Sequence, residues 1–169
     1  MHRPDADHLN YDSNRTSLSG VNGFINLSKV GGDNWRYDIG GRFRTAGFEA
    51  NDMGFMTEAD YTTSWVGVGY NEHRPSRHLR SWNVNWNLWQ SVTHGGERWS
   101  LGANIMANFQ LKNFWNVSLT GIYSHGLPSV YALRGGPRMR LPSRMGFSAS
   151  VMTDSRKPIQ ANLNLNTMF

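Results

Sequence analysis

The chain has 169 residues, a formal net charge of +5 and no cysteine, so it is about one domain long and lacks disulfides, thiolate metal ligands and a cysteine nucleophile. Hydrophobic residues make up 38% of the sequence, yet there are 7 Trp, 6 Tyr and 8 Phe. Because disordered chains are poor in aromatic residues, this combination favours a folded sheet that uses every second residue for apolar contacts.

Apolar and polar residues alternate with a period of two along most of the chain, and no segment repeats with the helical period. The pattern predicts eight strands, at residues 18–30, 34–45, 59–71, 79–93, 99–111, 115–124, 145–151 and 159–166. In the third of these the apolar parity switches near Gly67, which predicts a β-bulge there. Short turn-like segments separate most strands, and the connections 46–58 and 125–143 are longer.

The fourth segment shows the alternation most clearly, in the stretch SWNVNWNLWQSV at residues 81–92. Its apolar parity holds Trp82, Val84, Trp86 and Leu88, and its other parity holds Ser81, Asn83, Asn85 and Asn87. Small neutral polar groups suit a confined, hydrated interior, where they can hydrogen-bond one another and trapped water. The apolar parity would then face lipid.

Strand length also favours a membrane, because several predicted strands exceed the roughly five or six residues usual in soluble proteins. A tilted strand needs roughly nine to eleven residues to cross the hydrocarbon layer. No run of about 20 apolar residues exists, so no transmembrane helix is expected. Since every backbone polar group must be paired inside lipid, the sequence predicts an all-β antiparallel transmembrane β-barrel, or part of a larger one. We expect residues 1–17 to be a disordered or partial N-terminal segment and residues 18–169 to form the barrel segment.

Aromatic residues near the ends of the predicted strands fit this interpretation, because amphipathic rings form girdles at the membrane–water interface. The predicted girdle consists of Trp35, Trp82, Trp99, Trp115 and Tyr123. The alternative is that these rings are ordinary core residues of a soluble β-domain.

Four stretches carry a more specific signal: GFEANDMGF (47–55), RPSRHLRSWNVNWNLWQ (74–90), RGGPRMRLPS (134–143) and TDSRKP (153–158). In this order and spacing they resemble the C-terminal outer-membrane β-barrel region of a bacterial domain-of-unknown-function family, number 5916, over about residues 31–160. The resemblance implies a barrel that follows a family 9-type carbohydrate-binding-like module.

This sequence contains neither that module nor the apolar core of a signal peptide. Family members also continue beyond the position of Phe169, so the resemblance implies that the chain is a piece of a larger barrel. It brings no catalytic residues, because none is established for the family.

Charged residues gather in the connections rather than along the later strands. Glu49, Asp52, Glu58 and Asp60 could bind calcium or act as acid and base, or they could form ion pairs with Arg42, Arg44, Arg74 and Arg80 that hold the long connection. The second reading is favoured. Arg134, Arg138 and Arg140 surround a Gly-Gly-Pro turn and could bind a phosphate such as that of lipopolysaccharide, or could pair with the same acidic residues.

The histidines offer little evidence of an enzyme. His2, His8, His73, His78, His94 and His125 show no metal-ligand spacing. Outer-membrane phospholipases use a Ser/His pair on the outer face of a barrel, and His94 or His125 near a serine could form such a pair, but nothing in the spacing singles one out. No cofactor and no metal are expected. Because the basic residues gather in turn-like segments, no nucleic-acid partner is expected either.

The sequence therefore predicts a bacterial outer-membrane β-barrel protein that contacts lipid and has no enzymatic activity. It would pass or capture a solute, with carbohydrate or lipopolysaccharide as candidate partners. Two alternatives stay open: a hydrolase carried on a barrel, and a soluble β-sheet domain that binds carbohydrate through aromatic platforms.

Overall fold

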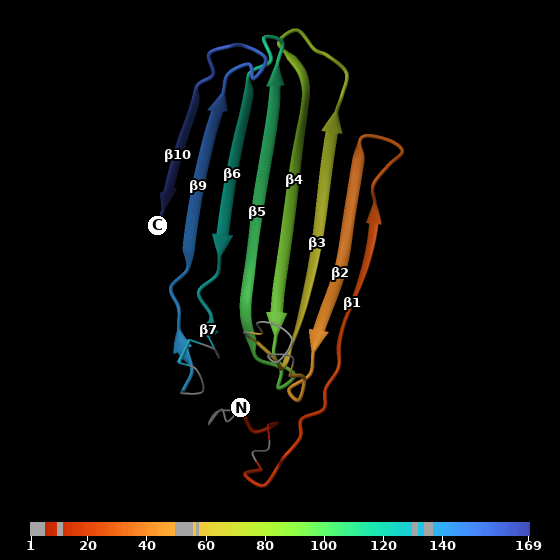
Figure 1. Cartoon of the computed structure of the whole chain (residues 1–169), viewed down its shortest axis with the longest axis vertical. Helices are drawn as coiled ribbons and strands as arrows, with labels where there is room; N and C mark the ends of the chain where they lie inside the picture. Colours follow the sequence, from red (N-terminus) through yellow and green to blue (C-terminus); the bar gives the residue numbers. More distant parts are fainter. Residues whose placement is uncertain (1–5, 10–11, 50–55, 57, 130–131, 134–136) are drawn as a thin grey trace.

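A computed structural model describes residues 6–9, 12–49, 56, 58–129, 132–133 and 137–169. Its main element is one antiparallel sheet of eight strands in the order β1-β2-β3-β4-β5-β6-β9-β10, so each strand follows its neighbour along the chain (Figure 1). The strands are β1 (Asn22–Lys29), β2 (Trp35–Arg44), β3 (Tyr61–Glu72), β4 (Leu79–Val92), β5 (Arg98–Leu111), β6 (Asn116–Ser124), β9 (Arg144–Met152) and β10 (Asn162–Met168). A separate small hairpin pairs β7 (Pro128–Ser129) with β8 (Met139–Arg140).

The predicted antiparallel arrangement of eight strands is confirmed, whereas closure into a barrel is not observed. β1 and β10 lie at opposite sides of the sheet, and neither has a second partner among the described residues (Figure 1). None of the described residues forms a helix long and apolar enough to cross a membrane.

Most cross-strand pairs join residues of the same kind, polar with polar on one face of the sheet and apolar with apolar on the other. Between β4 and β5, Asn83 pairs with Asn108 and Asn87 with Asn104, while Trp86 pairs with Ile105 on the other face. The register extends across the other strand pairs, so residues level with Trp86 and residues level with Asn87 stay on separate faces through all eight strands. We call the side that carries Trp86 the apolar face and the side that carries Asn87 the polar face.

The predicted bulge at Gly67 is wrong. Gly67 pairs in continuous register with Asp38 on one side and Asn87 on the other. The apolar residues change parity there because Trp65 stands on the polar face, where its cross-strand neighbour Gly40 leaves room for the indole. The register shifts occur between β4 and β5 instead, at Leu79/Ser81 and Ser91/Val92.

The connections divide between the two ends of the sheet. One end, which we call the short-turn end, carries the connections 30–34, 73–78, 112–115 and 153–161. The other, the long-loop end, carries the longer connections 45–60 and 125–143 together with the tight turn 93–97, at the bottom of Figure 1. All the connections at the short-turn end are short, so the sheet has two unlike ends.

Three turns meet at the short-turn end around Phe114. Phe114 has a left-handed backbone with φ of 65°, and its ring lies 4.0 Å from the Arg80 guanidinium carbon and 3.2 Å from that of Arg156. Guanidinium groups over an aromatic ring attract its π-electrons. Phe114 therefore links its own turn to the start of β4 and to the β9–β10 connection.

Asp154 holds Arg156 in this position. Its carboxylate accepts hydrogen bonds from Nε and Nη2 of Arg156 at 2.8 and 2.7 Å, and from the Arg156 backbone N–H at 3.0 Å. These bonds to the guanidinium and the backbone lower the pKa of Asp154 from 3.8 to about 2.

The substitution Asp154→Asn tests this anchor. Because the pKa is depressed in the folded chain, the carboxylate stabilises the fold above about pH 4 and stops doing so as the pH falls through about 2. The unfolding midpoint of the variant should therefore lie below that of the unsubstituted chain at pH 6, and the gap should close towards pH 2. A gap of constant size across this range, measured by thermal unfolding, would contradict the role of the ionised carboxylate.

Candidate functional site

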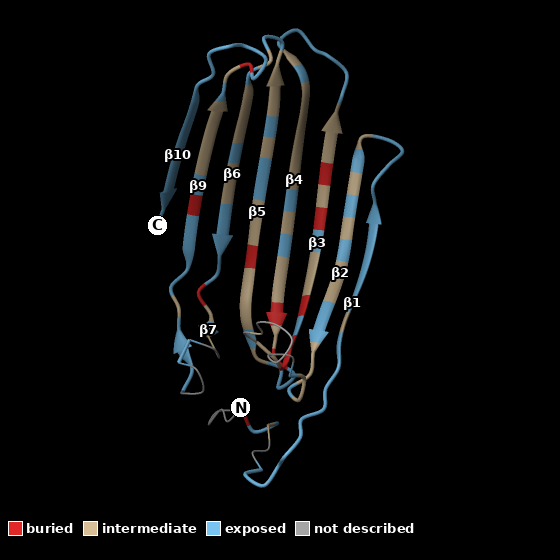
Figure 2. Ribbon diagram, in the orientation of Figure 1, coloured by how far each residue is buried: buried red, intermediate tan, exposed pale blue. Residues whose placement is uncertain are grey.

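None of the residues that the structure describes forms a layer over the apolar face. Its large side chains are exposed on every strand of the sheet: Ile25, Leu27, Trp35, Tyr37, Ile39, Phe43, Val66, Trp86, Leu88, Ile105, Leu119, Tyr123, Met145, Phe147, Leu163 and Leu165. Among the described residues only Ala6 and Tyr61 are buried hydrophobic residues, and no strand of the sheet is buried along its length (Figure 2). Such a continuous apolar surface marks contact with another apolar medium or molecule.

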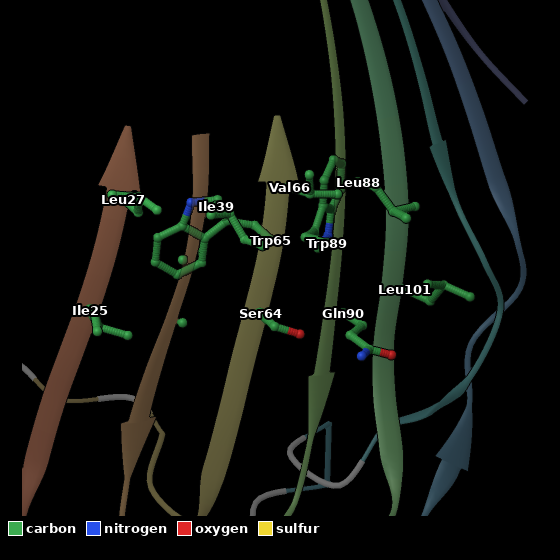
Figure 3. Close-up of a pocket in the computed structure, with 12 residues that line it drawn as sticks. Ile25, Leu27, Ile39, Ser64, Trp65, Val66, Leu88, Trp89, Gln90 and Leu101 are labelled. Carbon is green, nitrogen blue, oxygen red and sulfur yellow. The ribbon is translucent and has the colours of Figure 1, made fainter. Parts of the chain in front are cut away.

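A groove of about 640 Å³ runs along this face near the β1 side of the sheet (Figure 3). Its apolar lining comes from five strands and includes Ile25, Leu27, Ile39, Val66, Leu88 and Leu101. Gln90 and Ser64 add polar groups at one part of the rim. The groove suits a hydrocarbon chain better than a polar solute.

Aromatic rings form a row along the short-turn end of the apolar face. Tyr70 contacts Trp35 at 5.0 Å and Trp82 at 5.2 Å between ring centroids, so the row crosses β2, β3 and β4. Trp115 lies exposed in the turn before β6, at the same end. Three of the predicted girdle residues therefore gather at one end of the sheet, with Tyr70 added by the structure.

The two remaining girdle residues lie at the long-loop end. Tyr123 is exposed near the end of β6, and its hydroxyl is 3.0 Å from His125 Nδ1. Trp99 sits at the register shift of β5, and its ring meets Tyr61 edge-on at 6.1 Å. Since Tyr61 is buried and lies on the polar face, Trp99 packs within the protein rather than in a surface row.

The polar face carries a network of carboxamides. Asn87 donates to Asn104 at 2.7 Å, Asn108 donates to Asn83 at 3.0 Å, and Asn85 donates to Asn83 at 3.2 Å. The network spans β4 and β5 and consists of neutral groups. Asparagine and serine residues continue this face to β10, where Asn164 and Asn166 oppose Ser150 and Ser148.

Trp65 and Trp89 interrupt this polar face, which the sequence pattern did not reveal. They are direct cross-strand partners on β3 and β4, and each indole covers a glycine on the next strand outward, Gly40 for Trp65 and Gly102 for Trp89. Trp65 Nε1 donates to Asp38 at 2.6 Å. The presence of Gly on the neighbouring strand, opposite a Trp of polar parity, is the signal that could have located both rings.

Beside Trp65 the polar face is hollowed into a groove of about 300 Å³. Ser28, Arg36 and Asp38 line one side, Asn85 and Asn87 line the other, and the β3 glycines Gly67 and Gly69 lie between them. The amide oxygens of Asn87 and Asn85 bend over these glycines, at 2.8 and 2.5 Å from where a Cβ would stand. A side chain at either glycine would therefore displace an asparagine.

Asp60 forms the centre of a second polar site, at the long-loop end. Its carboxylate is 3% exposed and contacts His8 Nε2 at 2.8 Å and His94 Nδ1 at 3.4 Å. The other nitrogen of His94, Nε2, is 3.4 Å from the Thr62 hydroxyl. Asp60 also has a left-handed backbone, with φ of 65°, which a non-glycine residue seldom adopts.

The two histidines contact different oxygens of Asp60. Within the described part of the chain, no group of three or more His, Asp or Glu residues is suited to hold a metal ion. The contact of His8, which is far from Asp60 in sequence, instead attaches the N-terminal segment to the sheet.

The predicted acidic cluster divides between different partners. Asp60 pairs with the two histidines, whereas Glu58 lies near Arg42 and Arg44 and its backbone carbonyl accepts a hydrogen bond from Arg44 at 2.7 Å. Burial raises the pKa of Glu58, and the two arginines oppose that shift. Glu49 is exposed, and Asp52 lies outside the described residues.

The predicted arginine partners of this cluster lie partly elsewhere. Arg74 and Arg80 belong to the β3–β4 region at the short-turn end, so they cannot reach Asp60. Arg138 forms an ion pair with Glu97 of the β4–β5 turn, and Arg140 is exposed on β8. Arg134 lies outside the described residues.

The sequence profile described as Domain of unknown function (DUF5916) matches residues 5–169. The chain belongs to the DUF5916 family. This bears out the family resemblance of the sequence, and the match extends over almost the whole chain. Comparisons with curated proteins and with solved structures find no match for this DUF5916 chain.

Substitutions at Asp60 test whether its carboxylate holds the N-terminal segment. Asp60→Ala removes the acceptor for His8 and His94 and should lower the free energy of unfolding by about 1–3 kcal/mol. It should also speed cleavage by trypsin after Arg15, which follows the attached segment. Asp60→Asn keeps an acceptor oxygen, and asparagine tolerates the left-handed backbone. It should therefore lower the free energy of unfolding by less than Asp60→Ala does.

Asp60→Gly is the matched control for backbone strain, because glycine adopts positive φ freely but has no carboxylate. If Asp60→Gly and the unsubstituted chain were cleaved at the same rate, the attachment through the carboxylate would be refuted.

Proposed function

We propose that this chain is a membrane-spanning β-sheet of a bacterial outer-membrane barrel, whose apolar face contacts lipid and whose polar face lines an aqueous lumen. In this proposal the barrel passes or captures a polar solute, with carbohydrate as the leading class, and performs no chemistry on it. The observation that carries the proposal is the apolar face of a single eight-stranded sheet, which none of the described residues covers.

The magnitude of the apolar exposure supports a lipid environment. Moving one large apolar side chain from water into an apolar medium gains roughly 1.5–3 kcal/mol, so even ten of them would gain roughly 15–30 kcal/mol. That exceeds the whole folding stability of a typical domain, about 5–15 kcal/mol. A soluble sheet of this size would need a second layer over that face, and the described residues supply none.

The two sheet edges support a larger assembly. In lipid, unpaired N–H and C=O groups along β1 and β10 would be costly, so both edges need strand partners. Eight strands closed on themselves would leave an interior filled by side chains. Passage of a solute therefore requires further strands between β10 and β1.

The two ends of the sheet support an orientation. Outer-membrane barrels have short turns on the periplasmic side and long loops outside. The short-turn end, with its aromatic row of Trp35, Tyr70 and Trp82, fits the periplasmic interface. The long-loop end, with Asp60 and the β6–β9 connection, then faces the cell exterior, where lipopolysaccharide and carbohydrate are the partners within reach.

Adjacent residues of β4 provide a matched test of the two faces. Leu88→Lys places a charge on the proposed lipid face and should cost about 2–4 kcal/mol of stability in bilayers, whereas Asn87→Lys places the same charge in the lumen. We expect Leu88→Lys to insert poorly into phospholipid vesicles, and Asn87→Lys to insert as the unsubstituted chain does. Insertion is measured by protease protection and by the heat-dependent shift in electrophoretic mobility.

Two outcomes would contradict a membrane location. One is equal insertion of both lysine variants, and the other is a folded, monodisperse chain in buffer without detergent.

A hydrolase carried on the barrel is the second candidate function, and one observation favours it. A hydroxyl, an imidazole and a carboxylate lie in sequence there. The Thr62 hydroxyl is 3.4 Å from His94 Nε2, and His94 Nδ1 is 3.4 Å from the Asp60 carboxylate. In this arrangement His94 Nε2 would accept the Thr62 proton as the hydroxyl attacks an ester carbonyl, and Asp60 would orient the imidazole. The exposed position of Thr62, beside the lipid face, would direct the site towards ester bonds of lipids.

A vesicle assay tests this candidate. If the alignment is catalytic, the chain releases fatty acid from phospholipid vesicles, and both Thr62→Val and His94→Gln abolish the release. Thr120→Val is the control, because Thr120 is a strand threonine remote from His94 on the polar face of β6. Absence of release by the unsubstituted chain, or release that survives both substitutions, would eliminate the hydrolase.

A further inference from the structure

We propose that Trp65 and Trp89, with the asparagines beside them, form a binding site for a neutral saccharide on the polar face. The inference rests on the proposed function in one respect, because it treats the polar face as accessible to an aqueous solute. It goes further by assigning the site and the class of ligand.

The position of the two indoles is the first argument. Trp65 and Trp89 oppose each other across β3 and β4 in the middle of the sheet, and both lie on the face that carries Asn85, Asn87 and the β3 glycines. Figure 3 shows the Trp65 indole reaching over to β2, where it covers Gly40. The Trp89 indole covers Gly102 in the opposite direction. The two rings are half-buried, so they form an aromatic surface within a polar one.

The hydrogen-bonding groups around the rings are the second argument. The groove beside Trp65 is lined by Asp38, Asn85 and Asn87, and Asn87 bonds to Asn104 on the next strand. A carboxamide both donates and accepts hydrogen bonds, and can take part in up to four. Sugar hydroxyls also donate and accept, whereas the C–H faces of a pyranose are apolar and pack against aromatic rings. An indole next to a row of carboxamides offers both kinds of contact.

The charges of the groove favour a neutral ligand over an anionic one. Arg36 donates to the backbone carbonyls of Asp33 and Trp35, so its guanidinium is engaged within its own strand and turn. Asp38 accepts hydrogen bonds from the Ser28 hydroxyl at 2.5 Å and from Trp65 Nε1. Lys29, the third charged residue of the lining, forms an ion pair with Asp33 at 2.7 Å. All three charges of the groove are thus held by protein groups, and the carboxamides provide the polar surface.

The glycine partners have a specific consequence for this site. Gly40 and Gly102 have no Cβ, so the indoles can lie against the strands instead of projecting across the lumen. The polar groove lies along β3 over Gly67 and Gly69, and Asp38 connects it to Trp65, because Asp38 lines the groove and accepts the indole N–H.

The test measures binding of neutral linear oligosaccharides, maltohexaose and cellohexaose, to the folded chain in detergent micelles. Binding is followed by isothermal titration calorimetry and by quenching of tryptophan fluorescence. We expect Trp65→Ala and Trp89→Ala each to weaken the binding of at least one of these sugars by about tenfold or more. Asn87→Ala should weaken it several-fold.

Trp86→Ala is the matched control, because Trp86 lies on the same strand as Trp89 but on the apolar face. It should leave saccharide binding unchanged. Trp65→Phe and Trp89→Phe keep a ring over the glycines and should retain part of the affinity, which separates loss of the aromatic surface from loss of the fold. Circular dichroism confirms that each variant is folded.

Three results would overturn the saccharide site. They are no binding of either sugar by the folded chain at millimolar concentration, unchanged binding in the Trp65→Ala/Trp89→Ala variant, and salt-sensitive binding of oligogalacturonate in place of the neutral sugars. Failure of the membrane proposal is a separate result: a chain that is folded in plain buffer and binds cellohexaose through Trp65 and Trp89 would keep the site and lose the membrane location.

Discussion

The structure depends on the pleat of one sheet, which places polar side chains on one face and apolar side chains on the other. Successive side chains point to opposite faces, and the register of β4 with β5 sets Asn83 opposite Asn108 and Asn87 opposite Asn104 on one face, and Trp86 opposite Ile105 on the other. A shift of one residue in any pair would mix the two faces. None of the described residues covers the apolar face, so the described part of the chain lacks the hydrophobic core that a second layer gives a soluble sandwich. On the proposed function, lipid supplies that apolar contact.

The buried residues reflect the same arrangement. Among the described residues, the buried side chains other than those of Ala6 and Tyr61 are polar: Asp60, Thr63, Ser91, Thr93 and Asp154. Thr63 and Ser91 hydrogen-bond across β3 and β4 at 2.9 Å, and Asp60 is held by two histidines. Four of the five buried polar residues therefore lie near the long-loop end, whereas Asp154 lies at the short-turn end. An exposed apolar face and a hydrogen-bonded polar face are the reverse of a soluble β-domain, which is why the two-faced sheet favours the proposed lumen-lining role.

Much of the fold follows from local pattern, and the rest depends on contacts between distant residues. Period-two alternation located all eight strands of the sheet, because apolar and polar residues alternate within the sequence of each strand. The bulge expected at Gly67 failed because the apolar parity of Trp65 is decided by Gly40, on another strand. The pairing of His8 with Asp60 was missed for the same reason, since it joins residues 52 positions apart. Arg74 and Arg80 were assigned to the acidic cluster from composition, but the meander carries them to the opposite end of the sheet.

The two tryptophans on the polar face connect these observations to function. A sheet that only needed to separate lipid from water could carry serine or asparagine at both positions, and Gly40 and Gly102 would then be unnecessary. Each Trp–Gly pair costs β-propensity at the glycine, so a role beyond covering backbone would account for two of them side by side. On the proposed function, a solute that enters from the long-loop end first meets the charged surroundings of Asp60 and Arg42, and then the neutral strip of indoles and carboxamides. That order, from charge at the mouth to aromatic and amide groups within, suits a lumen that selects uncharged polyhydroxyl solutes.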